Sequence, residues 1–508
     1  GQIAGVEVKQ NTGAPGGGSI MRIRGAGSIG ASSEPLVVVD GIPIQNSYDK
    51  RTSPLSTISQ SNIESIDILK GVSATAIYGS RGDNGVIIIS TNSAETEETQ
   101  VSFTAKSGVS HMLASEKLDL MNAEEFARWR KQNRFEEAEF YGYEIGLEDI
   151  PEEYRHPEEW RGKGTDWQDV ITRIAPQSSF NLNVSHGTED FKSYSSIDYL
   201  DQKGIIKETG FQRLNLRSNL DYELNDMITA GIKIHPTLRW WNNQAAGGTS
   251  TTGSRGLPLG TAILNSPLDG PYKDDGVFEE EEYFDGKWDT AIHSADMFHG
   301  SNPLHRLDVT VDETQYFNMD IQPNLQINPL QGLTFRSQLN LQLSHESYEY
   351  FKPSTVTNIK SPPPTTIEGD HNTTRRYYWQ FENTLNYERT FGGHTVSGLA
   401  GYTMERYNSY SSSIHGYNYP DDAVKTLNAA SETVGSTGES NWSLISYLFR
   451  VSYDYNAKYL FTGTMRRDGS SRFGSENKWG YFPSASIGWN LSKESFFPDP
   501  QWLTNLKL

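Results

Sequence analysis

Beyond residue 100, apolar and polar residues alternate over long stretches of the chain. In residues 333–344, leucine and phenylalanine take nearly every second position, and threonine, arginine, glutamine and asparagine take most of the others. Because side chains along a β-strand point alternately to opposite faces, this pattern predicts a strand with one apolar and one polar face. We predict about twelve such strands, at residues 101–109, 178–187, 190–201, 214–224, 227–241, 317–328, 333–344, 375–390, 394–407, 442–456, 458–467 and 481–492.

These predicted strands are long. Most have about ten residues or more, whereas strands of soluble sheets average about 5–6 residues, and a tilted strand that crosses a bilayer needs about 9–11. A soluble sandwich also has strands with one apolar face and is the commoner kind of protein, so alternation alone leaves both architectures open.

The lengths of the connections separate the two architectures. Tight joins are expected at Gly187–Asp190, Asn225–Asp226, Asn328–Gly332, Phe391–Gly393 and Asn456–Ala457, and they take turns with longer joins at 111–176, 202–210, 242–312, 346–373, 408–440 and 467–480. Short turns at one end and long loops at the other are typical of a transmembrane barrel. Aromatic residues near the strand ends suit the interfacial girdles of such a barrel. The sequence therefore favours an antiparallel transmembrane β-barrel.

The long connections contain smaller predicted elements. Residues 122–133 have the pattern of a capped amphipathic helix with Phe126 and Trp129 on one face. Residues 165–176 predict a short helix that ends at Pro176, and Asp468-Gly469 predicts the bend of a hairpin.

The first 95 residues have a different pattern. Leu36–Val39 and Val86–Ile89 are short β-branched runs flanked by glycine, which predict buried strands, and residues 63–69 predict a third strand that is half-buried. A single helical turn is expected to stop at Gly79. We therefore predict a small α/β domain over residues 1–95 and a barrel portion with long loops over residues 96–508, with a charged linker between them.

The size of this domain constrains the barrel. About twelve strands close at a backbone radius of only ~13 Å, which is too narrow for a compact domain of about 95 residues with a radius of roughly 16 Å. A barrel of about 22 strands is wide enough. We expect that this chain carries about twelve of about 22 barrel strands, with the α/β domain as a plug in the lumen.

Four motifs support this interpretation by resemblance. The segments VVDGIPI, IESIDILKG with YGSRGDNGVIIIST, RDGSSRFG and NKWGYFPSASIGWNLSKE occur in this order. They closely resemble the SusC/RagA-type TonB-dependent outer-membrane transporters, in which the first two lie in the plug and the last two in the barrel. The resemblance covers essentially the whole chain.

The resemblance implies active import of a bulky nutrient, a glycan or a peptide, across the outer membrane of a Gram-negative, Bacteroidetes-like cell. A SusD-like surface lipoprotein would deliver the cargo. TonB, with ExbB and ExbD, would draw on the proton gradient to move the plug. The segment that TonB pulls in this family does not precede Gly1 in this sequence, so TonB coupling is implied by the resemblance alone.

Composition excludes several other functions. The 508 residues carry a net charge of −20, which argues against a nucleic-acid partner, and contain no cysteine for disulfides or thiolate metal sites. The sequence contains no run of about 20 apolar residues, so it predicts no transmembrane helix. We find no GxSxG, HExxH or Walker motif and expect neither enzymatic activity nor a cofactor. The acidic cluster at 278–282 fits no EF-hand spacing, so no metal is assigned.

Two groups of plug residues are candidates for function. Arg22 and Arg24 share one strand face, and with Arg81 they are assigned to contacts with acidic residues of the barrel wall; a solvated face is the alternative. The resemblance implies that the plug loops at 28–34 and 45–53 face outward and contact cargo; polar loops that are simply solvated are the alternative. Their amide, hydroxyl and charged side chains suit sugar hydroxyls or peptide groups, and the candidates are Ser32, Ser33, Gln45, Asn46, Tyr48, Asp49 and Arg51.

Two rival functions remain open at this stage. A passive porin or adhesion barrel would let cargo pass after the proton gradient collapses. A secreted glycan-binding or glycan-cleaving all-β protein would be soluble without detergent, and as an enzyme it would need paired carboxylates in a cleft.

Overall fold

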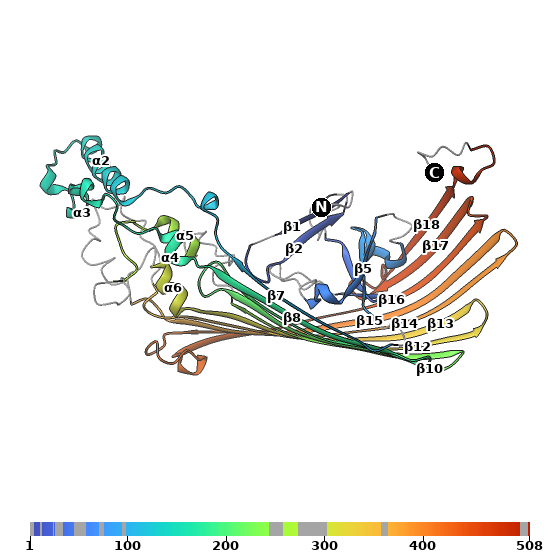
Figure 1. Ribbon diagram of the computed structural model, residues 1–508. Coiled ribbons are helices and arrows are strands. Elements are labelled where there is room, and N and C mark those ends of the chain that lie inside the picture. The colour runs from blue at the N-terminus through green and yellow to red at the C-terminus, as the bar shows by residue number, and fades with distance from the viewer. Residues whose placement is uncertain are drawn as a thin grey trace.

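The chain forms a long, curved antiparallel sheet with a small N-terminal unit on its concave side (Figure 1). The computed structural model describes residues 5–10, 13–23, 25, 34–44, 57–70, 76–93, 98–242, 258–272, 302–356, 364–497 and 506–508. The helices of the long connections gather at one end of the sheet (Figure 1).

The sheet, called the wall below, contains twelve strands, each hydrogen-bonded to the next in sequence. The strands are β7 (Gln100–Ser110), β8 (Ala175–Gly187), β9 (Phe191–Lys203), β10 (Gly210–Asn225), β11 (Ile228–Asn242), β12 (Val311–Leu330), β13 (Leu333–Lys352), β14 (Glu368–Phe391), β15 (His394–Tyr417), β16 (Glu432–Tyr455), β17 (Tyr459–Ser470) and β18 (Trp479–Trp489). Each predicted segment corresponds to one of these strands, which confirms the antiparallel barrel-type wall.

Alternation along each strand separates two faces of the wall. On β10, Asn215 and Arg217 are almost fully buried against the N-terminal unit, whereas Leu216 between them is 37% exposed. Phe103, Leu182, Ile197 and Leu216 continue one exposed apolar line across four neighbouring strands. An exposed apolar face opposite a polar, filled concave face is the arrangement of a lipid-facing barrel wall.

Short and long connections alternate, as the sequence predicts. The short ones are 188–190, 226–227, 331–332, 392–393 and 456–458, and the long ones are 111–174, 204–209, 243–310, 353–367, 418–431 and 471–478. In an antiparallel meander, alternate connections lie at opposite ends of the sheet. The long connections therefore share one end, and their described residues carry α2 (Ala123–Tyr141), α3 (Glu152–Arg155), α4 (Trp167–Ile171), α5 (Pro258–Leu264) and α6 (Pro303–Val309) with the 3₁₀ turns η4 (Ala114–Glu116), η5 (Leu147–Asp149), η6 (Pro157–Trp160) and η9 (Leu427–Ala429).

Three local predictions for the wall and its connections need correction. The helix at 122–133 is present but extends to Tyr141, because Asn122 and Glu125 form a capping box at its start and Gly142 closes it in the left-handed conformation. The helix expected to reach Pro176 ends at Ile171, and Pro176 already belongs to β8. The bend predicted at Asp468-Gly469 is wrong, because both residues pair with β18 and the chain turns over 471–478.

The N-terminal unit consists of two small sheets. β1 (Val6–Gln10) and β2 (Ser19–Ile23) form an antiparallel pair. β3 (Leu36–Val39), β4 (Ile42–Pro43), β5 (Ile63–Leu69) and β6 (Val86–Thr91) form a second sheet in the order β4-β3-β6-β5, in which β3 and β6 are parallel. The 3₁₀ turn η2 (Gln60–Asn62) precedes β5, and η3 (Ala76–Gly82) precedes β6.

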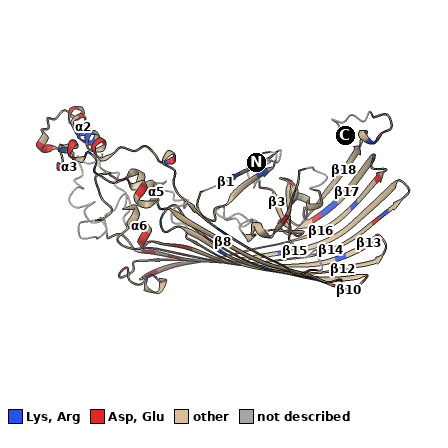
Figure 2. Cartoon of the chain, viewed as in Figure 1, with Lys and Arg blue, Asp and Glu red and all other residues tan. Residues whose placement is uncertain are grey.

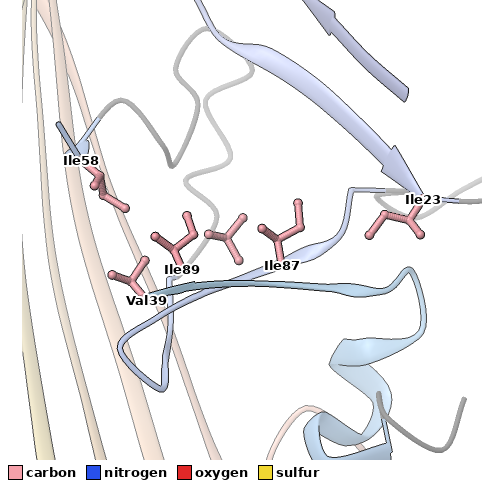
Figure 3. Close-up of a cluster of buried hydrophobic side chains, with 6 residues drawn as sticks. Ile23, Val39, Ile58, Ile87 and Ile89 are labelled. Carbon is pink, nitrogen blue, oxygen red and sulfur yellow. The ribbon is translucent and has the colours of Figure 1, made fainter. Parts of the chain in front are cut away.

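The core of this unit confirms the predicted buried strands. Ile23 of β2, Val37 and Val39 of β3, and Ile87 and Ile89 of β6 form one buried cluster with Ile58 (Figure 3). Each such side chain contributes about 1.5–3 kcal/mol when fully buried. The predicted helical turn does not stop at Gly79. It continues as a second 3₁₀ turn to Gly82, with the chain kinked at Gly79 (φ 60°, ψ −142°).

No helix in the described part of the chain is long and apolar enough to span a membrane.

Candidate functional site between the N-terminal unit and the wall

Asp40 ties the N-terminal unit to the middle of the wall. It follows β3 at a positive φ of 50°, and this turn aims its carboxylate at the end of β6. Its Oδ1 accepts from the Thr91 backbone N–H at 3.0 Å, and its Oδ2 accepts from the Thr91 hydroxyl at 2.6 Å. The same Oδ2 lies 2.6 Å from Arg217 Nη2 of β10 and 3.3 Å from Lys233 Nζ of β11. Asp40 thus joins two strand ends of the N-terminal unit to two strands of the wall.

Burial and charge act on Asp40 in opposite directions. Burial alone would raise the pKa of the carboxyl group, but the cations of Lys233 and Arg217 and the hydrogen bonds from Thr91 outweigh it. The pKa of Asp40 is therefore lowered from its ordinary value, and the group is ionised at neutral pH.

Polar wall residues around Asp40 bind the irregular backbone of the N-terminal unit. Asn215 donates to the Thr57 carbonyl at 2.6 Å, and Arg213 donates to the Ile58 carbonyl at 3.1 Å. On the neighbouring strand, Asp198 Oδ2 accepts from the Ser59 hydroxyl at 2.7 Å, and its Oδ1 accepts from Arg213 at 3.0 Å. Each buried polar group that was left without such a hydrogen bond would destabilise the folded state by about 1–3 kcal/mol.

Arg81 of η3 makes a second attachment, on β14 and β15. Its Nη1 and Nη2 donate to the two carboxylate oxygens of Glu405, each at 2.8 Å. The Tyr378 hydroxyl donates to Glu405 Oε2 at 2.8 Å, and Glu405 is only 2% exposed. Burial opposes ionisation of Arg81, but Glu405 outweighs it and raises the pKa of the guanidinium. Because the two hydrogen bonds are parallel, this pair fixes the orientation of the Arg81 guanidinium on the wall in addition to neutralising the charge of Glu405.

Gly79 lies against β17 next to this pair. Arg466 donates through Nη1 to the Ile77 carbonyl and through Nε to Asp468 Oδ1, the latter at 2.7 Å. A Cβ on Gly79 would overlap Asp468 Oδ2 and lie 2.6 Å from Arg466 Nε. Only glycine allows the backbone of η3 to approach the wall this closely.

The predicted site residues fall into three groups. Arg81 lies against the wall at Glu405. Arg22 lies in β2 opposite Glu7, its Nε is buried without a hydrogen-bond partner, and no ion pair from Arg22 to the wall exists among the described residues. The remaining candidates lie outside the described residues: Arg24, Ser32, Ser33, Gln45, Asn46, Tyr48, Asp49 and Arg51.

Sequence reasoning missed the wall residues of this site. The alternation along β10 was the only local indication of these residues, because it marks which positions of the strand are polar. The polar positions that contact the N-terminal unit are Arg213, Asn215, Arg217 and Asn219. Asp40 and Gly41 form the turn after β3, and nothing in this short segment of sequence indicates the ion pairs of Asp40 with Arg217 and Lys233.

The acidic cluster at 278–282 also lies outside the described residues, and the described part of the chain contains no group of three or more His, Asp or Glu side chains placed to hold a metal ion. Acidic residues are frequent on α2 and α3, at the end of the molecule that carries the long connections (Figure 2). The charged contacts with the N-terminal unit lie instead on the strands of the wall.

Comparison with known proteins relates these features to one family. Residues 1–86 match the TonB-dependent receptor plug domain. The whole chain is 31% identical to TonB-dependent receptor P39 of Formosa agariphila and 28% identical to TonB-dependent receptor SusC of Bacteroides thetaiotaomicron. It covers 45% and 48% of these relatives, so the chain spans about half of their length.

Solved structures show the same fold. A structure of the RagAB peptide importer in a closed state superposes with a TM-score of 0.78 at 23% identity, over 97% of this chain and 55% of that one. The unliganded ferric citrate transporter FecA gives a TM-score of 0.54 at 12% identity, over 96% of this chain and 55% of that one. The curved wall with a domain on its concave side is the arrangement of a plugged barrel.

Proposed function

The chain belongs to the TonB-dependent receptors of the SusC/RagA type, and on this premise we propose that it forms the plug and wall strands of a transporter that imports a bulky nutrient. The transporter lies in the outer membrane of a Bacteroidetes-like cell, with its apolar wall face against lipid. The plug comprises residues 1–95 and the wall portion residues 96–508. The protein binds and moves its cargo and does not transform it chemically.

One observation carries this proposal. The plug is attached to the wall at two separate places, through Asp40 on β10 and β11 and through Arg81 on β15, and each attachment is an ion pair on a buried carboxylate. Hydrogen bonds between the plug and Arg213, Asn215 and Asp198 reinforce them, so moving the plug away from the wall breaks all of these contacts together. Cargo can pass only after work is done on the plug. We propose that TonB, with ExbB and ExbD, supplies this work from the proton gradient.

The long connections provide the outer surface. They share one end of the wall, where a SusD-like surface lipoprotein would deliver a glycan or a peptide. The similarity to SusC and to the RagAB peptide importer supports a partner of this type. Cargo would then meet the plug loops that contain Ser32, Ser33, Gln45, Asn46, Tyr48, Asp49 and Arg51.

Uptake in whole cells tests this function. The cargo is first identified by mass spectrometry of material that copurifies with the protein, and its labelled form is then supplied to cells with and without a protonophore. The proposal predicts that uptake stops when the proton gradient collapses. Uptake that continues at the same rate would instead indicate a passive pore.

A further inference from the structure

Beyond Glu405, towards the long connections, the inner face of the wall carries an aromatic cluster. Tyr378 donates to Glu405, the residue that holds Arg81 of the plug, so Tyr378 faces the plug side. In the strand register Tyr407 of β15 lies opposite Tyr378, and Trp442 of β16 lies opposite Tyr407. Because residues opposite one another share a face, all three aromatic side chains belong to the inner face.

The rings of this cluster are stacked and only partly covered. The Tyr407 and Trp442 ring centroids are 5.8 Å apart with the planes at 18°, and the Tyr378 and Trp442 centroids are 6.2 Å apart. Tyr378 is buried, whereas Tyr407 and Trp442 are half-buried. Offset stacks of this kind hold their rings in fixed positions, and the partly exposed area of Tyr407 and Trp442 offers a rigid surface for a ring-shaped ligand.

Arg472 adds a positive charge to this surface. It comes from the connection between β17 and β18, and its guanidinium carbon lies 5.1 Å from the centroid of the Trp442 ring. Arg472 is exposed, and within the described residues it forms no ion pair with a carboxylate. A guanidinium held over an aromatic ring directs its N–H donors sideways, where they suit the oxygens of a carboxylate or a sulfate.

Small hydroxyl side chains continue the same face. Ser409 and Ser440 lie opposite each other one step beyond Tyr407 and Trp442, and Ser413 and Ser436 pair further along the same two strands. All four are at least partly exposed. A serine hydroxyl both donates and accepts, which matches the hydroxyl groups of a sugar.

We propose that this surface, the Trp442 platform (Tyr407, Trp442, Arg472, Ser409 and Ser440), binds a saccharide ring that carries a carboxylate or sulfate group. The aromatic rings stack on the apolar face of the sugar, Arg472 binds its anionic group, and the serines bind its hydroxyls. The proposal rests on the proposed import function and narrows the cargo to acidic glycans. The platform adjoins the Arg81 attachment through Tyr378, so cargo bound there lies beside a contact that must open.

Binding to the detergent-purified protein tests the platform. The probes are an oligogalacturonate, a maltooligosaccharide of the same length and an oligoglutamate of the same charge as the oligogalacturonate, each titrated by calorimetry. We expect the oligogalacturonate to bind about tenfold more tightly than the neutral sugar, because its carboxylates form charge-assisted hydrogen bonds with Arg472. We expect Trp442→Ala to weaken its binding about tenfold through loss of stacking. Arg472→Gln should abolish the preference for the acidic sugar while binding of the neutral sugar remains.

Two further variants separate binding from folding. Trp379→Ala removes an aromatic ring from the opposite face of β14 and should leave all affinities unchanged, and Trp442→Phe should retain most of the binding. Equal affinity for acidic and neutral sugars, or unchanged binding by Trp442→Ala, would overturn the proposal. So would oligoglutamate binding that is as tight as oligogalacturonate binding and is lost in Trp442→Ala, because the platform would then prefer a peptide.

The inference and the proposed function can fail separately. If uptake depends on the proton gradient but Trp442→Ala binds the oligogalacturonate normally, the platform assignment fails and the import function stands. If Trp442→Ala abolishes binding but uptake persists without the gradient, energised import fails and the binding site stands.

Discussion

Arg81 and Glu405 lie 324 positions apart in the sequence and form a bidentate ion pair with both N–O distances at 2.8 Å. The pair joins a 3₁₀ turn of the plug to a wall strand, and Tyr378 completes the shell around the carboxylate. Because Glu405 is buried, each partner depends on the other for its charge balance.

Glu405→Ala should loosen η3 from the wall. The substitution leaves the Arg81 cation without its counter-ion, at a cost of about 3 kcal/mol, the lower end for buried pairs because Arg81 keeps some contact with solvent. Hydrogen exchange of the amides in residues 76–82 should accelerate by about a hundredfold, since about 1.4 kcal/mol corresponds to a factor of ten. Glu439→Ala, at an exposed position on β16, is the control and should leave this exchange unchanged. Equal protection in both variants would show that the pair does not hold the plug.

Gly79→Ala should displace η3 for a steric reason. Gly79 has φ +60° and its Cβ would overlap side-chain atoms of the wall, whereas Gly392 has φ +57° and nothing within 4 Å of its Cβ position. Both substitutions place a Cβ at a positive φ, but only Gly79 combines this with a ψ of −142° and with wall atoms at its Cβ position, so the difference between the two variants reports the backbone strain and the clash of η3 together. We expect Gly79→Ala to increase protease cleavage of the plug, while Gly392→Ala leaves cleavage as in the native protein. Equal cleavage of the two variants would contradict the close approach.

Acid should weaken the Asp40 attachment. The pKa of Asp40 is lowered in the folded protein from its ordinary value of 3.8. The ionised carboxylate therefore contributes stability that is fully present above about pH 4–5 and is lost as the pH falls through the lowered folded-state value. Cleavage of the plug, measured at each pH with a protease that is active there and normalised to its cleavage of an unfolded substrate, should rise below this range in the native protein. Asp40→Asn should raise cleavage already at neutral pH and remove this acid step, whereas Asp67→Asn at an exposed position should keep it.

A charge on the apolar face should prevent membrane insertion. Phe449 lies on that face of β16 and is 58% exposed, whereas Val434 lies on the inner face with Ser436 and Ser440 and is 56% exposed. An arginine that faces lipid near the bilayer midplane costs about 2–4 kcal/mol, whereas one on the inner face meets no lipid. Phe449→Arg should reduce the yield of protein folded into lipid vesicles, and Val434→Arg should leave it unchanged. Similar yields would place Phe449 away from lipid.

The wall was largely predictable, because alternation is a local signal that each strand carries by itself. Strand length was underestimated where both faces are polar. Residues 408–417 extend β15 with serine, asparagine and histidine on its two faces, so no alternation marks them, and only pairing with β14 and β16 makes them a strand. The bend predicted at Asp468 failed for a related reason: Arg466 binds this carboxylate within the strand.

Of the contacts between plug and wall, the sequence indicated a residue on the plug side but not its partner on the wall. Arg81 was assigned to the barrel wall, but no local pattern connects it with Glu405, which is one polar residue among many on β15. Asp40 has the sequence signature of a turn residue, and its ion pairs arise from how β3 docks on β10 and β11. Long-range partners of this kind depend on the register of the whole wall, which no short segment specifies.

The central claim is that the plug lies against the inner face of the wall and must move for cargo to pass. The most direct test tethers the two parts in the otherwise cysteine-free chain. Ser59→Cys and Asp198→Cys, at positions that share a 2.7 Å hydrogen bond, are joined with a short reagent that reacts with two thiols and is released by a reductant. We predict that uptake of the identified cargo stops on tethering and returns after reduction. Undiminished uptake by the fully tethered protein would contradict the account.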